Sequence, residues 1–293
     1  MYNFNYNINN QKKKDDFVLL TIATDRNIWL DDWENTVKKW KYNYKILGLG
    51  QKWDGFETKI NLIIDYSSKC DPNKLICIVD AYDLIIAGPQ SELISKFNKF
   101  NKKIVVGTED VCGPNCFKTD IPVIYEKRPN INGGFIMGRS KDINHLYKNV
   151  LNLCSYDDQV GIAKYAKEHS DEFHLDSKQS LVLNLNYGKE IKDLKLLENG
   201  RFLYIPTDVK PVIIHTPFMQ KDLGTRSNFV RKHAIMNYNK ISKIKFLLEF
   251  LKHIKKHMKN PIYKNLVRII FGIIFVIILI IFYFIYKALK KNN

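Results

Sequence analysis

The stretch Leu-Ile-Cys-Ile-Val-Asp-Ala-Tyr-Asp, residues 75–83, decides the fold class of this chain. Its first five residues are apolar and rich in β-branched side chains, which is typical of a buried central strand. Two carboxylates, Asp80 and Asp83, follow that strand. Ligands of open α/β sheets bind at the carboxyl ends of strands, and carboxylate oxygens suit a hard divalent cation. The stretch therefore predicts a strand that ends in a metal-binding pair, although a solvated strand end followed by a turn has the same spacing.

Strand and helix patterns alternate on either side of this stretch. Strands are predicted at 17–24, 44–49, 75–79 and 103–107, and helices at 29–40, 59–66 and 89–100. This alternation predicts a doubly wound, Rossmann-like α/β fold with a mostly parallel sheet. Because crossover connections are right-handed, the first and third strands should end at the same rim. That arrangement would bring Thr24 and Asp25 close to Asp80 and Asp83.

The second half of the chain contains further polar motifs between predicted elements. Gly133 and Gly134 either let the backbone approach a ligand or form a tight turn into a strand. Asp157 and Asp158 open a helix, where acidic side chains suit the helix dipole. His215 follows an apolar strand and is either a satisfied core residue or a ligand. The remaining predicted elements are a helix at 142–153 and short strands at 173–185, 202–206 and 211–217.

Charge is unevenly distributed along the 293 residues. The formal net charge is +16, with 46 Lys and Arg against 30 Asp and Glu. From residue 240 onward there are 12 basic residues and one acid, a net of +11, which leaves +5 for residues 1–239. A basic C-terminal part favours an anionic membrane surface as partner, and no nucleic-acid-binding motif accompanies it. Five cysteines, an odd and small number, do not indicate a disulfide framework.

The C-terminal part has the pattern of a membrane anchor. Residues 240–265 are basic and amphipathic, and residues 266–287 include 18 consecutive uncharged residues from Ile269 to Tyr286. A helix of that length spans roughly 30 Å, the thickness of the hydrocarbon core of a bilayer. More Lys and Arg precede this segment than follow it, so the positive-inside rule predicts a folded domain on the cytosolic side.

The chain is therefore expected to have five segments. Residues 1–16 form a polar, Asn-rich arm that lacks the apolar core of a signal peptide. The other four are a folded domain at 17–239, a juxtamembrane segment at 240–265, a transmembrane helix at 266–287 and a basic tail at 288–293. A single membrane span near the C-terminus is the predicted localisation.

The order of motifs from residue 17 to about residue 225 resembles the glycosyltransferase domain of multifunctional procollagen lysyl hydroxylases and of related collagen glycosyltransferases. The matching segments are Leu-Leu-Thr-Ile-Ala-Thr (19–24), Ile-Leu-Gly-Leu-Gly (46–50) with Trp53, Ile-Val-Asp-Ala-Tyr-Asp-Leu-Ile-Ile-Ala-Gly (78–88), Gly-Gly-Phe-Ile (133–136), Asp-Asp-Gln (157–159), Leu-Asp-Ser-Lys (175–178) and Val-Ile-Ile-His (212–215). The shared order is more specific than any single motif. It implies a nucleotide-sugar glycosyltransferase of the GT-A type, and no segment matches the hydroxylase domain.

The resemblance also implies a metal site. In the family, the two Asp of an Asp-x-x-Asp motif and a late His hold Mn²⁺, which binds the diphosphate of a UDP-sugar. The matching residues here are Asp80, Asp83 and His215. Two carboxylates and one imidazole suit Mn²⁺, which neutralises charge on the departing UDP.

Other positions match the donor and acceptor sides of the family site. Lys59 and Lys221 match basic donor-binding positions near the diphosphate, while Thr24 and Asp25 lie near the uridine or ribose by position. Asp157 and Asp158 match an acidic loop that faces the sugar and the acceptor. Either carboxylate is a candidate to orient or deprotonate the acceptor hydroxyl; the sequence does not choose between them.

The acceptor side departs from the family pattern. The family has Trp after the Cys of the acceptor-side loop, whereas Gly113 follows Cys112 here. Asn130 and Asn132 both compete for one family Asn, and the segment after His215 differs from the family's His-Gly-Asn-Gly type. The expected reaction is Mn²⁺-dependent transfer of glucose from UDP-glucose to galactosyl-hydroxylysine or hydroxylysine of a collagen-like protein. The alternatives are a galactosyltransferase, a transferase for another membrane-surface glycan, and a catalytically silent membrane-anchored scaffold.

Overall fold

The computed structural model describes residues 16–217, apart from 111–118, 120, 125 and 186–190. The chain divides into two units, Met1–Asn239 and Lys240–Asn293. The predicted juxtamembrane segment, transmembrane helix and basic tail lie outside the described residues, as do Lys221, Cys112 and nearly all of the N-terminal arm. Within the described part of the chain, no helix is both long and apolar enough to cross a membrane.

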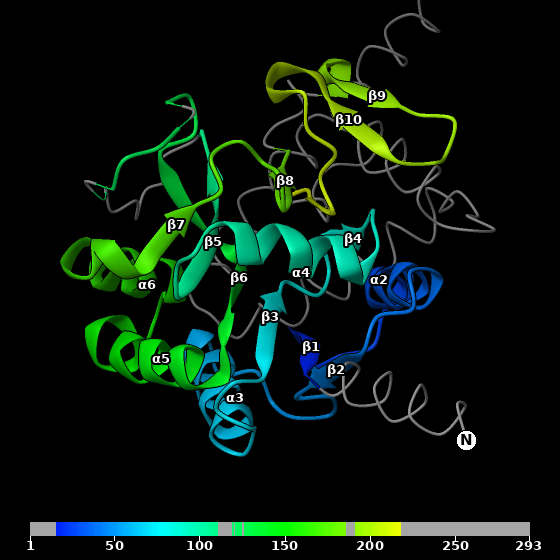
Figure 1. Ribbon diagram of the computed structural model, residues 1–293. Helices are drawn as coiled ribbons and strands as arrows, with labels where there is room; N and C mark the ends of the chain where they lie inside the picture. The colour runs from blue at the N-terminus through cyan, green and yellow to red at the C-terminus, as the bar shows by residue number, and fades with distance from the viewer. Residues whose placement is uncertain (1–15, 111–118, 120, 125, 186–190, 218–293) are drawn as a thin grey trace, which may run out of the picture. The chain divides into compact units, whose positions relative to one another are not determined.

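A six-stranded sheet in the order β2-β1-β3-β6-β5-β7 forms the centre of the described domain (Figure 1). The strands are β1 (Phe17–Ile22), β2 (Tyr44–Leu47), β3 (Leu75–Val79), β5 (Ile104–Glu109), β6 (Asn130–Arg139) and β7 (Phe173–Leu175). Strand β6 runs antiparallel to its neighbours β3 and β5, and the other pairs in this sheet are parallel. The predicted α/β fold with a mostly parallel sheet is therefore confirmed, with one reversed strand inserted near its middle.

The sheet is buried on both faces by helices. Phe17 and Leu19 of β1 pack in the cluster that contains Leu30 and Trp33, whereas Val18 and Leu20 pack in the cluster that contains Ile60, Ile143 and Ile162. The first cluster involves α2 (Ile28–Lys39) and α4 (Gln90–Lys99), and the second involves α3 (Phe56–Ser68), α5 (Ser140–Cys154) and α6 (Asp158–Glu168). Successive strand side chains point to opposite faces, so strands covered on both sides are continuously apolar.

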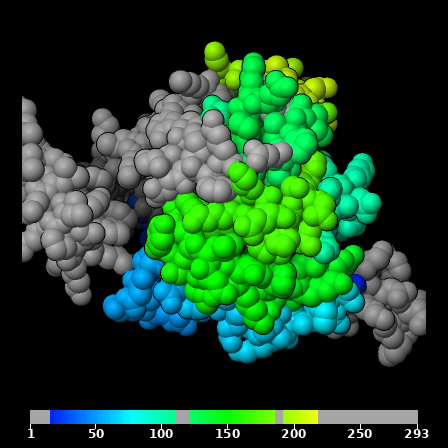
Figure 2. Space-filling model, turned by 90° about the vertical axis from the view of Figure 1, so that its left-hand side faces the viewer, coloured from blue at the N-terminus to red at the C-terminus, as the bar shows by residue number. Residues whose placement is uncertain are grey.

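Figure 2 shows the outer surface of one helical layer, where the green atoms of α5 and α6 lie side by side.

The helix predicted at 29–40 is confirmed as α2, and its start is fixed by Asn27, whose side chain accepts hydrogen bonds from the backbone N–H groups of Trp29 and Leu30. Capping by Asn satisfies amide groups that have no partner inside the helix. The sequence therefore predicted this helix but not its N-cap residue.

A second, three-stranded sheet lies beyond the carboxyl end of β3. Its order is β4-β11-β8, with β4 (Leu84–Ile86), β8 (Val182–Asn184) and β11 (Ile213–His215). Strand β11 is antiparallel to β4 and parallel to β8. The hairpin of β9 (Leu194–Leu196) and β10 (Phe202–Tyr204) packs on it through a shared apolar cluster. Short 3₁₀ helices occur at Ser170–Glu172, Ile191–Asp193 and Ile205–Thr207. This small sheet joins three segments that are far apart in the sequence.

Candidate metal centre

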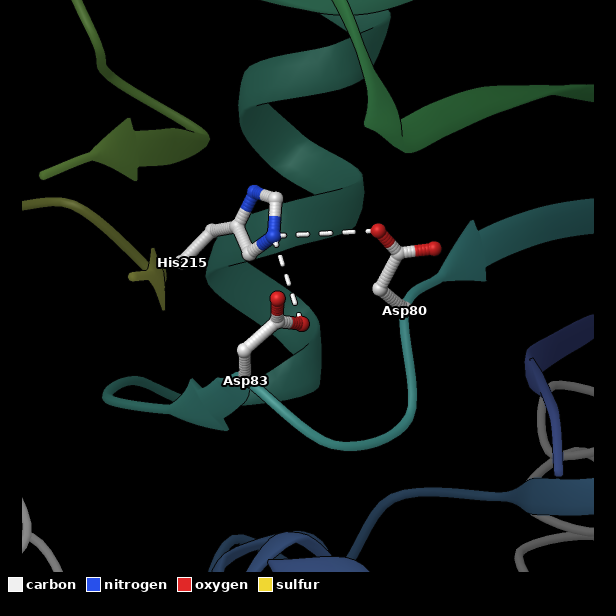
Figure 3. Close-up of side chains that lie close together, drawn as sticks. All are labelled: Asp80, Asp83 and His215. Atoms are coloured by element: carbon white, nitrogen blue, oxygen red, sulfur yellow. Dashed lines mark ion pairs between the residues drawn. The ribbon is translucent and has the colours of Figure 1, made fainter. Parts of the chain in front are cut away.

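Asp80, Asp83 and His215 meet at the junction of the two sheets (Figure 3). Asp80 follows β3 of the large sheet, Asp83 precedes β4 of the small sheet, and His215 is the last residue of β11. Because β11 pairs with β4 so that His215 lies opposite Leu84, the imidazole reaches back to the turn between the two carboxylates. One potential ligand atom from each residue lies within 4.8 Å of the others.

The Nε2 atom of His215 is the centre of this group. It lies 3.4 Å from Oδ1 of Asp83 and 3.7 Å from Oδ2 of Asp80. The atom is buried and has no hydrogen-bond partner among the described residues, whereas the side chains of Asp80 and Asp83 are 35% and 23% exposed. Two oxygen donors and a buried nitrogen without a partner form a donor set that fits a divalent cation approached from the solvent side.

The charges at the site are strongly coupled. Burial would lower the pKa of His215, but the carboxylates of Asp83 and Asp80 outweigh burial and raise it above its ordinary value. Burial would raise the pKa of Asp80, but Lys59 and His215 outweigh burial and lower it. Asp80 is therefore ionised at neutral pH, which is the form that a metal cation requires.

Gly134 makes room for the imidazole. A Cβ atom at this position would lie 2.3 Å from Cε1 and 2.7 Å from Nδ1 of His215. Both glycines lie inside β6 and not in a turn before it, and the group that approaches the backbone at Gly134 is a side chain of the protein itself. Close approach of a ligand to these glycines stays a prediction. The neighbouring Gly133 lies against Gln159, whose Oε1 accepts a hydrogen bond from the Gly133 N–H at 2.8 Å.

Lys59 lies beneath the cluster and bridges two acids. Its Nζ atom is 3.0 Å from Oδ1 of Asp80 and 2.8 Å from Oδ2 of Asp158, and its side chain is only 7% exposed. Burial would lower the pKa of Lys59, but Asp158 and Asp80 outweigh burial and raise the pKa well above its ordinary value. The lysine selected as a donor-binding residue thus contacts the protein's own carboxylates, and its contact with a donor stays a prediction.

The two acids of the Asp-Asp-Gln motif have different environments. Asp157 is the N-cap of α6, and its Oδ1 accepts a hydrogen bond from the N–H of Val160 at 3.1 Å. The prediction that this motif opens a helix is therefore confirmed, with Asp157 as the N-cap and Asp158 as the first helical residue. Asp158 is buried against Lys59, and burial raises its pKa although Lys59 opposes the shift. Through Lys59, Asp158 is linked to the candidate metal cluster, whereas Asp157 caps the start of α6.

The remaining predicted residues lie around the same edge. The hydroxyl of Tyr82, between the two acids, donates a hydrogen bond to the carbonyl of Asp25 at 2.9 Å, so the end of β1 lies beside the turn. The carbonyl of Thr24 accepts a hydrogen bond from the N–H of Gly50 at 2.9 Å. Of the two competing asparagines, Asn132 lies nearer the cluster, because its Oδ1 accepts the N–H of Gly134. Asn130 instead donates to the carbonyl of Asp110.

Sequence reasoning missed Asn184. Its Oδ1 atom lies 2.7 Å from Nδ1 of His215, and its side chain is fully buried. Asn184 ends a strand of three residues, too short for any periodic pattern, and no charged or glycine motif marks it. Only the parallel pairing of β8 with β11, which sets Asn184 beside His215, reveals this contact.

Known proteins resemble the chain over most of this domain. The family model described as PLOD GT domain matches residues 13–240, well over half of the sequence. The chain belongs to this family. As a PLOD GT domain, it is a glycosyltransferase, in agreement with the resemblance drawn from its motifs.

Individual relatives are distant and longer. The chain is 26% identical over 222 residues to the multifunctional procollagen lysine hydroxylase and glycosyltransferase of Caenorhabditis elegans, an alignment that covers 68% of this chain and 30% of that protein. It is 28% identical over 204 residues to the procollagen-lysine,2-oxoglutarate 5-dioxygenase 2 of Mus musculus, with 64% of this chain and 27% of that protein covered. The chain thus spans less than a third of the length of these curated relatives.

A solved structure is also similar. It is a glycosyltransferase involved in the glycosylation of the major capsid of PBCV-1, with 13% identity and a TM-score of 0.45 over 74% of this chain and 98% of the other.

Proposed function

We propose that the chain is a Mn²⁺-dependent, GT-A-type hexosyltransferase that takes its sugar from a UDP-sugar donor and delivers it to hydroxylysine or galactosyl-hydroxylysine of a collagen-like protein. Glucose from UDP-glucose is our first choice of sugar. The observation that carries the proposal is the buried Nε2 atom of His215, which faces Asp80 and Asp83 and has no hydrogen-bond partner among the described residues. Family membership supports the reaction class, and this cluster supports the cation.

The three ligands have defined tasks in this proposal. Asp80, Asp83 and His215 would hold the cation, which when bound supplies positive charge to the diphosphate and to the departing UDP. Asp80 uses one oxygen for Lys59 and turns the other toward His215, so it presents a single oxygen to the site. The partial exposure of both carboxylates leaves a side from which a diphosphate can approach.

Asp158 is the stronger candidate for the acceptor side. It is joined through Lys59 to Asp80, and a carboxylate with a raised pKa is a better general base than an ordinary one. Asp157 is occupied as the cap of α6 and would hold the helix start that carries Asp158. Thr24 and Asp25, beside the turn of residues 80–83, would border the uridine or ribose, and Lys221 would add a charge near the diphosphate.

The acceptor is inferred from the relatives. The relative from Caenorhabditis elegans is named as a multifunctional procollagen lysine hydroxylase and glycosyltransferase. A collagen-like acceptor is therefore the first to test. A galactosyltransferase, or a transferase for another membrane-surface glycan, remains the second proposal, because Gly113 stands where the family has Trp. A silent scaffold is disfavoured by the presence of all three ligands.

We also propose that the C-terminal segment is a membrane anchor. The uncharged run within residues 266–287 and its basic flanks support a single membrane span with the transferase domain on the cytosolic side.

A UDP-release assay tests the function. UDP-glucose and UDP-galactose are each combined with hydroxylysine and with galactosyl-hydroxylysine, with and without Mn²⁺. The expected result is release that requires Mn²⁺ and is greatest for UDP-glucose with galactosyl-hydroxylysine. Asp80→Asn and Asp83→Asn should each lower release by more than about 100-fold, since loss of a supporting residue alone typically lowers metal affinity or activity 10- to 100-fold.

Asp65→Asn is the matched control. Asp65 is an exposed acid of α3 that pairs with Lys69 one helical turn away, so release should be unchanged. Full activity in EDTA, or in the Asp80 and Asp83 variants, would reject the metal assignment. Release with UDP-galactose alone would favour the second proposal, and absence of release with every pair would favour the scaffold.

A further inference from the structure

Asn184 and His215 are neighbours on parallel strands. They occupy paired positions of β8 and β11, and the N–H of Leu185 donates to the carbonyl of His215 at 2.8 Å. Their side chains meet at 2.7 Å, Oδ1 of Asn184 to Nδ1 of His215. Both residues are buried, with 0% and 2% of their surface exposed. The contact is therefore shielded from water and fixed by the sheet itself.

The orientation of the Asn184 amide follows from its second partner. Its Nδ2 atom lies 2.8 Å from the carbonyl oxygen of Thr108. A carbonyl oxygen only accepts hydrogen bonds, so the group that faces it must be the NH₂ end of the amide. The oxygen end consequently faces His215. An amide oxygen also only accepts, and Nδ1 of His215 must therefore carry the proton.

Gln179 reinforces this orientation. The backbone N–H of Asn184 donates to Oε1 of Gln179 at 2.7 Å, which identifies that atom as the oxygen. The Nε2 end of Gln179 then donates to the carbonyl and the hydroxyl of Thr108. Gly107 leaves the space for this packing, because a Cβ there would lie 3.2 Å from Nδ2 of Asn184. The asparagine is thus held on its backbone and on its side chain.

A neutral imidazole with its proton on Nδ1 carries its lone pair on Nε2. In His215 that atom is the one that points at Asp80 and Asp83 (Figure 3). In the other tautomer, Nε2 would carry a proton and could bind no cation. We infer that Asn184 is a positioning residue that holds His215 in the Nδ1–H tautomer and so presents the Nε2 lone pair to a divalent cation. The metal part of this inference rests on the proposed function, whereas the tautomer is a property of the protein alone.

A neutral partner suits this position. Histidine ligands usually donate their second N–H to a carboxylate, a backbone carbonyl or water. An amide adds no charge to a site that already contains the carboxylates of Asp80 and Asp83 and the ammonium group of Lys59 beside Asp80. A carboxylate at residue 184 would add a third negative charge and would turn an oxygen toward the carbonyl of Thr108.

The tautomer is measured first, in the metal-free protein. Histidine is labelled with ¹⁵N, and long-range ¹H–¹⁵N correlation spectra distinguish protonated from unprotonated ring nitrogens at a pH where His215 is neutral. His215→Gln assigns the signals among the seven histidines. The expected result is a protonated Nδ1 and an unprotonated Nε2. A protonated Nε2 in the wild-type protein would overturn the inference.

Variants then test the role of Asn184 through Mn²⁺ affinity, followed by the electron paramagnetic resonance of free Mn²⁺. Asn184→Leu removes the acceptor and should mix the tautomers and weaken Mn²⁺ binding roughly 10- to 100-fold. Asn184→Asp still offers an oxygen to Nδ1–H and should keep the Nδ1–H tautomer, whereas its stability should fall because a carboxylate oxygen replaces the NH₂ group that faces the Thr108 carbonyl. A leucine variant that folds and keeps both the tautomer and the affinity would overturn the inference.

Thr108→Val is the structural control. It removes a buried hydroxyl that bonds to Gln179 and to the carbonyl of Asp176, but it leaves the Thr108 carbonyl that holds Asn184. Its stability should fall while the tautomer and Mn²⁺ affinity stay at the wild-type values. If Asn184→Leu does not fold, the inference is tested by the tautomer of His215 in the wild-type protein and in Asn184→Asp. If the wild type shows the Nδ1–H tautomer and binds no Mn²⁺, the positioning role stands and the proposed metal function falls.

Discussion

The ammonium group of Lys59 lies 3.0 Å from one carboxylate oxygen of Asp80, while the other oxygen of that carboxylate faces His215. Because Lys59 also pairs with Asp158 at 2.8 Å, a single buried cation joins a candidate metal ligand to a candidate catalytic acid. If the proposed function holds, this relationship couples metal binding, the acceptor side and fold stability. It also means that changes at Lys59 should affect all three.

Lys59→Met is expected to lower the free energy of unfolding by about 3 to 5 kcal/mol, because removing one partner of a buried ion pair leaves an uncompensated charge. Mn²⁺ affinity should fall as well, since Asp80 loses the group that orients it. Urea denaturation and Mn²⁺ titration measure the two effects. The control is Lys69→Met, which removes an exposed pair with Asp65 and should change stability by less than about 1 kcal/mol.

A different outcome would support direct contact between Lys59 and the UDP-sugar donor. If Lys59→Met keeps its stability and its Mn²⁺ affinity but raises KM for the UDP-sugar, the lysine contacts the donor and the ion pairs seen here are secondary.

Gly134→Ala is expected to weaken Mn²⁺ binding roughly 10- to 100-fold. The added Cβ would lie 2.3 Å from the His215 ring, and overpacking of this kind typically lowers stability by about 1 to 3 kcal/mol. Calorimetric titration with Mn²⁺ and thermal unfolding measure these effects. Gly133→Ala is the comparison, because its Cβ would contact Gln159 at 3.2 Å and not the imidazole. Equal loss of Mn²⁺ affinity in the two variants would show that the His215 contact is not the cause.

His174 should make stability depend on pH. Its ring stacks on Phe100 with centroids 3.9 Å apart, and burial, assisted by Lys102, lowers the pKa of His174 from 6.5 to about 4. The unfolded chain therefore binds the proton more readily than the folded chain between these two values. The stability that neutral His174 contributes above pH 6.5 is therefore lost as the pH falls toward 4. The free energy of unfolding should be lower by roughly 2 kcal/mol near pH 4.5.

His174→Phe keeps an aromatic ring against Phe100 and removes the titration. Urea denaturation of both proteins at pH 7.5 and near pH 4.5 compares them. The wild type should lose more stability than the variant on acidification. Parallel losses in the two proteins would exclude His174 as the source.

Deletion of residues 265–293 is expected to release the protein from membranes into the soluble fraction, because the proposed span is the uncharged run that ends at Tyr286. Carbonate extraction of the full chain and of the truncated chain measures this, and UDP release should be the same for both. Ile277→Arg in the full chain is a point substitution that should weaken insertion by about 3 kcal/mol. Retention of the truncated protein in the carbonate pellet would refute the anchor.

The sequence by itself determined four strands of the large sheet, β1, β2, β3 and β5, and the acids at its rim. Strands such as β1 and β3 are five or six residues long and covered on both faces, so each gives an uninterrupted apolar run that can be recognised without its partners. Asp80 and Asp83 follow directly from such a run. The motif order across the domain also carried the resemblance that the family comparison supports.

Only the tertiary structure decided how the small sheet completes the site. Strands β4, β8 and β11 have three residues each, too few to show periodicity. Their pairing joins positions that are far apart along the chain, 31 residues for Asn184 and His215 and 215 − 84 = 131 residues for His215 and Leu84. The reversal of β6, the burial of Lys59 between two acids and the meeting of Asn184 with His215 depend on such long-range pairing. Local sequence fixes which residues form a strand, but the neighbour of a strand is selected by the packing of the whole domain.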